Sequence, residues 1–334
     1  MVGDLPARTG LVHVNFADVR GQLKEFTRGL LSRYVTDQHV RGYCLHFLAQ
    51  EGAILNEGPV VGIGHGAFLV FNATGGTDTR QFIPPTAGLE LLNLGIELLD
   101  KVTDEEPPVG EGIWTVPRMA IVASVLQSLS TLAVADMPGV TRRVQAAYQR
   151  LLSRTNVTIL SGGNKDILLA DKKNATVNDS LKLAVYKSQA LGDCMGRIGA
   201  MAAGAPAPVV EACARFGAYA LVSAALVNDM HDARPGSENK SDIRLRRKTA
   251  PVTYLLTRTP RTRFTEAKRL LRGEAPLTAE QESVVRRAIE ESGAVQFTAT
   301  LADAFRYKAR DALERVNEAV DVSLLSRGLL QWQD

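Results

Sequence analysis

Apolar residues recur at the 3.6-residue period of amphipathic helices along most of this chain, and this pattern constrains the fold more than any other feature. Aromatic residues make up only 6% of the sequence. Helical segments do not alternate with strand-like segments, which disfavours a parallel α/β sheet. We therefore predict an all-α fold.

The periodicity predicts helices over residues 17–33, 39–52, 86–103, 115–134, 138–158, 176–203, 208–231, 249–257, 264–271, 278–292 and 297–318. Residues 54–85 differ, because Val60-Val61 and Phe68-Leu-Val-Phe71 stand among glycines and threonines. That stretch predicts a β-hairpin or a small irregular insertion. Since no Pro/Gly/Ser-rich linker divides the chain, we expect a single domain over residues 1–334.

Composition excludes several classes of protein. The 39 Lys and Arg residues nearly balance the 36 Asp and Glu residues, so a strongly basic nucleic-acid-binding protein is not indicated. The three cysteines form no CxxC pair, which is typical of reduced thiols in the cytoplasm. The first ten residues lack the apolar run of a signal peptide. The apolar stretch 119–135 contains Gln127 and is slightly short for a membrane span. We expect a cytoplasmic protein without stable membrane insertion and without a nucleic-acid partner.

Two acidic clusters remain after common catalytic motifs are excluded. Asp100 and Asp104 lie four residues apart at the end of an apolar helix, so their side chains share one face. Carboxylates at a helix C-terminus oppose the helix dipole. Paired carboxylates with this spacing suit Mg²⁺, which binds a few protein oxygens and shares its other positions with water and phosphate. The alternative interpretation is an ordinary solvated helix end.

The second cluster ends another apolar helix. Asn228 and Asp232 are again four residues apart, with Asp229 beside them. A basic segment, 240–249, follows directly. An acidic helix end followed by a cationic loop is suited to a diphosphate, because metal ions bridge carboxylates to phosphate oxygens and Lys or Arg neutralises the remaining charge. The alternative for the basic segment is a solvated face.

These segments resemble, in order, the motifs of the polyprenyl (trans-isoprenyl) diphosphate synthases. Asp100–Asp104 is similar to the first DDxxD motif, and Phe216-Gly217 through Asp232 resembles the helix with the second. The similarity continues in segments that resemble the family's other conserved stretches: Gly162-Gly-Asn-Lys-Asp-Ile167, Tyr186-Lys-Ser188, Lys240-Ser-Asp-Ile243, Arg247-Lys-Thr-Ala-Pro-Val252, Glu291-Ser-Gly-Ala294 and Ala302–Ala309. It is clearest over residues 86–330, and the shared order is stronger evidence than any single motif.

The resemblance implies an isoprenoid-synthase helical bundle around a central cavity, in a homodimer. It also implies an allylic isoprenyl diphosphate substrate bound with three Mg²⁺ ions. The metal ligands it implies are Asp100, Asp104, Asn228, Asp229 and Asp232. The diphosphate-binding residues it implies are Arg41, Lys187, Lys240 and Lys248. Asp100, Asp104, Asp229 and Lys187 are the implied catalytic residues.

The chain departs from the family pattern at several positions. Lys101 replaces the second Asp of the first motif, and the Arg-Arg-Gly sequence that follows it in the family is missing. The family's Lys- and Arg-rich segment for isopentenyl diphosphate is represented only by residues 38–42, where Arg41 remains. Each lost charge-assisted contact removes about 1.5–3 kcal/mol. We therefore expect isopentenyl diphosphate to be a poor second substrate.

Three functions fit these residues. The first is a Mg²⁺-dependent prenyltransferase that ionises an allylic diphosphate and passes the prenyl group to isopentenyl diphosphate or to an unusual acceptor. Ala224 and Ala225 replace bulkier family residues and leave room for such an acceptor. The second is a class I terpene synthase, which needs the metal cage without an isopentenyl diphosphate site. The third is a non-catalytic subunit of a heteromeric synthase, which Lys101 favours and the retained aspartates disfavour.

Overall fold

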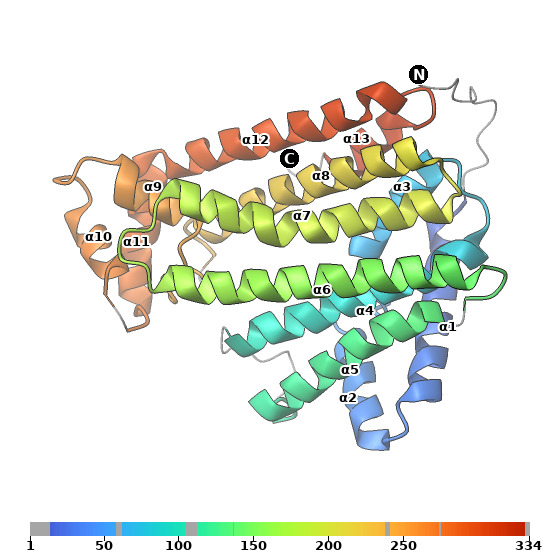
Figure 1. Ribbon diagram of the computed structural model, residues 1–334. Helices are drawn as coiled ribbons and strands as arrows, with labels where there is room; N and C mark the ends of the chain where they lie inside the picture. The colour runs from blue at the N-terminus through green and yellow to red at the C-terminus, as the bar shows by residue number, and fades with distance from the viewer. Residues whose placement is uncertain are drawn as a thin grey trace.

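The computed structural model describes residues 14–57, 62–103, 112–135, 137–237, 241–273 and 275–330. Within these ranges every regular element is a helix, which confirms the predicted all-α fold (Figure 1). The α-helices are α1 (Phe16–Tyr34), α2 (Gln38–Leu48), α3 (Ile63–Ala73), α4 (Thr79–Thr103), α5 (Val116–Ala135), α6 (Arg142–Ala170), α7 (Val177–Ala202), α8 (Ala207–Asp232), α9 (Ala250–Arg258), α10 (Thr265–Leu271), α11 (Ala279–Ser292), α12 (Ala294–Leu313) and α13 (Val322–Leu329). A 3₁₀ turn, η1 (Glu314–Val316), follows α12.

The long helices lie side by side and form the body of the molecule. Helix α7 packs against α8 and α6, α12 covers α8, and α4 packs against α5 (Figure 1). One large apolar core joins α1–α8 and the C-terminal segment, and a second joins the end of α8 to α9–α12. The short helices α9–α11 gather at the end of the bundle where α6 ends and α7 begins. They therefore enclose that end of the molecule.

Helices α7 and α8 approach each other more closely than ordinary side chains allow. A Cβ atom at Gly192 would overlap the carbonyl group of Gly217, and one at Gly196 would overlap that of Cys213. Neighbouring helices usually pack with their axes 8–10 Å apart, at a distance that depends on the side chains at the contact. Glycine at these positions lets the two backbones touch, and this contact fixes the relative position of the two helices.

Of the two alternatives predicted for residues 54–85, the β-hairpin is wrong for the described residues, while Val60 and Val61 lie outside them. Phe68–Phe71 belongs to α3, whose residues from Gly66 to Ala73 are all buried, so the apolar run reflects burial on every side rather than the alternation of a strand. The glycines before it make room for Glu90 of α4, since a Cβ at Gly62 would lie 2.8 Å from its carboxylate. Glu90 accepts a 2.6 Å hydrogen bond from the backbone N–H of Gly64. This bond places the carboxylate at the N-terminus of α3, where the helix dipole favours it.

Other parts of the helix pattern also differ from the prediction. Helix α6 continues through Gly162 and Gly163 to Ala170, although the sequence predicts its end at residue 158. Helix α4 starts at Thr79 and contains two buried prolines, Pro84 and Pro85, so it begins seven residues before the predicted start at residue 86. Helix α13 has no counterpart among the predicted helices. In each case contacts with neighbouring helices outweigh the local helix-breaking tendency of Gly or Pro.

Helices α5 and α8 are long and apolar enough to cross a membrane by length and composition alone. In their most apolar windows, 44% of the residues of α5 and 56% of those of α8 are buried inside the protein. Core helices of this kind pass the same test, so the finding is weak evidence for a membrane span.

The close contact between α7 and α8 predicts that adding one methyl group at the contact lowers the stability of the protein. Gly192→Ala should lower the free energy of unfolding by about 3 kcal/mol, because the methyl group meets backbone atoms that cannot move aside. Gly21→Ala is the control, since its Cβ on α1 meets nothing within 4 Å. That variant should gain about 0.5–1 kcal/mol from helix propensity. Chemical denaturation measures both values, and equal stability of the two variants would contradict the packing argument.

The buried carboxylate of Glu90 predicts how stability depends on pH. Burial raises its pKa to about 7, and the hydrogen bond from Gly64 only partly opposes this shift. The folded state therefore holds the proton more tightly, and stability is lost as the pH rises from the ordinary pKa of 4.5 toward 7. Relative to Glu90→Gln, the wild-type protein should lose roughly 3 kcal/mol over this interval. Denaturation at several pH values checks this. The exposed Glu25→Gln variant should behave like the wild type, and a constant difference between wild type and Glu90→Gln would refute the prediction.

Candidate active site

A cavity of about 320 Å³ lies at the end of the bundle that α9–α11 enclose. Its walls come from the last turns of α4 and α8, the second half of α6, the first half of α7 and the segment before α9. The N-terminus of α7 is fixed by a capping box between Thr176 and Asp179. The five elements that form these walls are far apart in the sequence, and each contributes side chains to one site.

The wall from α4 carries the first acidic position. Asp100 lines the cavity, and its backbone carbonyl accepts a 2.8 Å hydrogen bond from the hydroxyl of Thr103. The neighbouring Lys101 is not among the residues that line the cavity. Its ammonium lies 3.9 Å from the carboxylate of Glu97, one turn earlier on the same helix. The lysine that replaces the second aspartate of the motif is therefore directed along the helix surface.

The wall from α8 carries the second acidic cluster. Asn228, Asp229 and Asp232 all line the cavity. The side-chain amide of Asn228 donates a 2.7 Å hydrogen bond to the carboxylate of Asp232, as the spacing of four residues in a helix allows. This bond leaves the amide oxygen of Asn228 available as a neutral metal ligand.

Helices α6 and α7 contribute an ion pair. The ammonium of Lys187 donates to the carboxylate of Asp166 over 3.1 Å. Burial disfavours the charged form of Lys187, but Asp100 and Asp166 outweigh it and raise the pKa of this lysine. Gly162 makes the close approach of the two helices possible, because a Cβ there would lie 2.7 Å from Cγ of Lys187. Lys187 is thus held as a cation between two carboxylates.

The segment before α9 completes the site with Asp242, Arg247 and Lys248. The Lys248 ammonium lies 3.3 Å from the carbonyl oxygens of Arg246 and Leu271. Burial and the nearby guanidinium of Arg246 lower the pKa of Lys248. In this conformation Lys248 binds carbonyl groups at the edge of the cavity, and Arg247 and Lys187 are the other cationic side chains of its lining.

The carboxylates repel one another. Burial and the nearby Asp242 raise the pKa of Asp229 well above its usual value, and a hydrogen bond from the backbone of Ala250 only partly offsets this. The charges of Asp232 and Asp166 act in the same direction. Burial and mutual repulsion disfavour the ionised form of these carboxylates. A cation bound between them would make the ionised form favourable.

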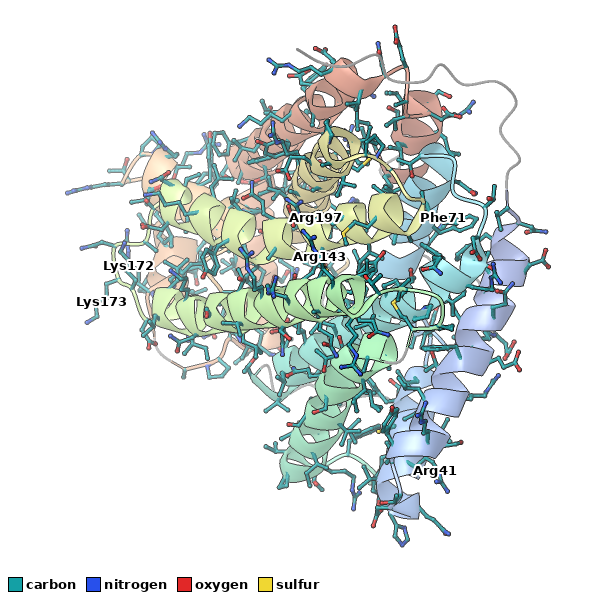
Figure 2. The ribbon with its side chains drawn as sticks, turned by 45° about the vertical axis from the view of Figure 1, so that its right-hand side comes forward. Arg41, Phe71, Arg143, Lys172, Lys173 and Arg197 are labelled. Atoms are coloured by element: carbon teal, nitrogen blue, oxygen red, sulfur yellow. The ribbon has the colours of Figure 1, made fainter. Side chains whose placement is uncertain are left out.

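Most of the predicted site residues meet in this cavity. Asp100, Asn228, Asp229, Asp232, Lys187 and Lys248 all line it. Asp104 and Lys240 lie outside the described residues. Arg41 is elsewhere, on α2, where it donates to the carbonyl of Val35 at 3.2 Å. Figure 2 shows Arg41 far from Lys172 and Lys173, which mark the turn between α6 and α7.

The sequence analysis assigned no role to three further lining residues. Asp166, Asp242 and Arg247 belong to segments already identified by their resemblance, so the signal was present in the sequence. What was missing was their direction, as Arg246 shows: it stands next to Arg247, but it donates to the carbonyl of Leu270 over 2.8 Å. Only the packing of α6 against α7 and the turn before α9 decide which side chain enters the cavity.

The donor atoms of the cavity fit Mg²⁺. Carboxylate and amide oxygens predominate, and Mg²⁺ prefers oxygen ligands. Within the described ranges no three His, Cys, Asp or Glu side chains gather closely enough to hold a metal alone. The acidic residues instead occupy separate walls, an arrangement that suits ions shared with a phosphate ligand in the middle.

Sequence comparison relates the chain to known proteins, although no model of a protein family matches it. The (2E,6E)-farnesyl diphosphate synthase of Mycobacterium tuberculosis (strain ATCC 25618 / H37Rv) is 26% identical over 233 residues. The aligned region covers 65% of this chain and 64% of that protein, so it spans somewhat less than two thirds of the relative's length.

Structural comparison gives a wider match. A polyprenyl synthetase from Streptomyces coelicolor A3(2) superposes with a TM-score of 0.77 at 20% identity, over 94% of this chain and 98% of that one. A polyprenyl synthase from Caulobacter crescentus CB15, solved with calcium and isoprenyl diphosphate, gives a TM-score of 0.76 at 19% identity, over 98% and 100%. At this level of identity the superpositions establish the fold. The chain therefore has the all-helical isoprenoid-synthase fold, and its sequence is similar to that of prenyl diphosphate synthases.

Proposed function

We propose that this protein is a Mg²⁺-dependent prenyltransferase that ionises an allylic isoprenyl diphosphate in the cavity and transfers the prenyl group to an acceptor. The observation that carries the proposal is the meeting of two acidic helix ends, α4 and α8, in one cavity that also contains Lys187 and Arg247. The named relatives are consistent with it, since they include a farnesyl diphosphate synthase and a structure with calcium and isoprenyl diphosphate.

Each wall of the cavity has a part in the reaction. Asp100 on α4 and Asn228, Asp229 and Asp232 on α8 would hold Mg²⁺, with Asp104 as a further ligand. Bound Mg²⁺ would neutralise the charge that develops on the departing diphosphate. Lys187 is already positioned as a cation by Asp166, so it needs little reorganisation to bind a phosphate oxygen.

Part of the remaining lining is apolar. Ile167, Leu183, Ala184 and Ala225 line the cavity beside the charged groups. An allylic carbocation is quenched by water, and apolar side chains around the reacting carbon exclude water from it. The small side chain of Ala225 leaves space next to Asn228 and Asp229 for an acceptor.

Direct assay tests the proposal. The purified protein is incubated with Mg²⁺ and geranyl, farnesyl or geranylgeranyl diphosphate, each with and without isopentenyl diphosphate, and released pyrophosphate and organic products are measured. We expect pyrophosphate release that Asp100→Asn reduces at least about 100-fold, since loss of a ligand should exceed the effect of an outer-shell change. Asp311→Asn, an exposed aspartate on α12, is the matched control and should leave the rate unchanged.

The products separate the alternatives. Longer prenyl diphosphates formed only with isopentenyl diphosphate would indicate chain elongation. Hydrocarbons or alcohols formed without it would indicate a terpene synthase. Absence of pyrophosphate under every condition would reject the catalytic proposal and favour the non-catalytic subunit. Full activity of Asp100→Asn would reject the assignment of the metal site.

We also propose that the protein forms a homodimer through α6. Val157, Leu160 and Leu168 lie on one outer face of this helix, and Val157 is 65% exposed. Aliphatic side chains gathered on one exposed helix face are typical of surfaces that bind another protein. The polyprenyl diphosphate synthases that this sequence resembles are usually dimeric, which supports a second copy of the chain as the partner.

The proposed dimer interface on α6 predicts that a charged side chain at Val157 disrupts the dimer. Val157→Lys should convert the dimer to a monomer, because two lysines would face each other across a twofold interface. Tyr307→Lys on α12 is the control, since Tyr307 is also 65% exposed and should leave the mass unchanged. Light scattering after gel filtration measures both. A monomeric wild type, or a dimeric Val157→Lys, would contradict the assignment.

A further inference from the structure

Among the described residues, the largest completely buried side chain is a cation, Arg286 on α11. One terminal nitrogen of its guanidinium donates to the backbone carbonyls of Asp232 and of Arg234, the latter over 3.2 Å. The other forms a 3.2 Å ion pair with Glu282, which lies one turn earlier on α11 and is also buried. Glu282 therefore orients the guanidinium toward the end of α8.

The end of α8 is an unfavourable place for the carboxylates it carries. The last carbonyl groups of a helix hold partial negative charge, and Asp229 and Asp232 add two formal charges to it. Ser237 donates to the carbonyl of His231 over 2.9 Å, and Arg286 binds the next carbonyls of the turn. Arg286 is not among the residues that line the cavity. Its positive charge acts on the end of α8 through its hydrogen bonds to the backbone carbonyls.

We propose that Arg286 is a positioning residue for the metal site on α8. This inference rests on the proposed function of the cavity. By binding the carbonyl of Asp232, Arg286 fixes the backbone from which the Asp232 carboxylate projects, and its charge offsets the repulsion that the helix end imposes on that carboxylate. Asn228 is held in turn, because its amide donates to the Asp232 side chain over 2.7 Å. A single buried arginine thus orients two of the expected metal ligands.

If Arg286 had a purely structural role, its loss would affect stability alone. The chain contains a second buried cation that serves as a control for this possibility. Lys268 on α10 is 3% exposed, and its ammonium donates to the carbonyls of Pro260 at 2.6 Å and Thr259 at 3.2 Å. Like Arg286, it is a buried cation that binds backbone carbonyl groups. Unlike the partners of Arg286, which include Asp232, these two partners are not among the described residues that line the cavity. Loss of either cation should destabilise the fold, but only loss of Arg286 should weaken metal binding.

The experiment measures Mg²⁺-dependent binding of inorganic pyrophosphate by calorimetry, together with thermal unfolding, for wild type, Arg286→Gln, Arg286→Lys and Lys268→Gln. We expect Arg286→Gln to weaken binding about 10- to 100-fold, the usual effect of losing a group that orients a metal ligand. Arg286→Lys keeps the charge but loses the forked geometry, so its affinity should be intermediate. Lys268→Gln should lower the melting temperature without changing the affinity.

Wild-type affinity in Arg286→Gln would overturn the inference. Equal weakening by Lys268→Gln would also overturn it, because the effect would then follow general stability. If Arg286→Gln does not fold, Arg286→Lys decides between the same two outcomes. Failure of the wild type itself to bind Mg²⁺ and pyrophosphate would instead reject the proposed function of the cavity, and with it this inference.

Discussion

The backbone contact between α7 and α8 determines where the other parts of the site lie. Gly192 and Gly217 let these helices touch, so Lys187 and the Asn228–Asp232 turn have fixed positions on either side of the cavity. Side chains at the contact would push the helix axes apart, and protein interiors do not absorb such shifts without strain. Gly162 has the same function between α6 and α7, next to Lys187. The positions of the site residues are therefore fixed by glycines at helix contacts, where the absence of a side chain lets the helices approach closely.

Electrostatic repulsion is the second constraint, and the fold balances it locally. Three of the aspartates on the walls of the cavity lie near a group that reduces the repulsion: Lys187 pairs with Asp166, the backbone of Ala250 donates to Asp229, and Arg286 binds the backbone carbonyl of Asp232. Neutralisation is still incomplete, as the raised pKa of Asp229 shows. A site in this condition is already organised, and preorganisation of this kind lowers the free energy needed to bind a charged ligand.

The sequence predicted the long helices through their 3.6-residue periodicity and most of the cavity through the family resemblance. Asp100, Asn228, Asp229, Asp232 and Lys187 stand in segments that resemble the motifs of the polyprenyl diphosphate synthases, and that resemblance implied that they meet. The hairpin expected within residues 54–85 could not be corrected from the sequence. A segment buried on all sides, like Phe68–Phe71, has no periodicity, and Gly62 and Gly64 are explained only by Glu90, a residue far away in the chain. Arg41 is not among the residues that line the cavity, and the sequence could not show this, because a short local similarity does not show where a helix packs.

Lys101 shows how a substitution that looks disruptive in a motif can be accommodated by the helix that carries it. In a helix, residues one position apart point about 100° away from each other, so Lys101 can be directed away from a cavity that Asp100 lines. Asp100 lines it, and Lys101 is directed to Glu97 along the outer surface of α4. The ammonium therefore does not stand among the carboxylates, where it would compete with a metal ion. The altered motif is compatible with a functioning metal site because helix geometry, rather than the composition of the motif, decides which charges the cavity contains.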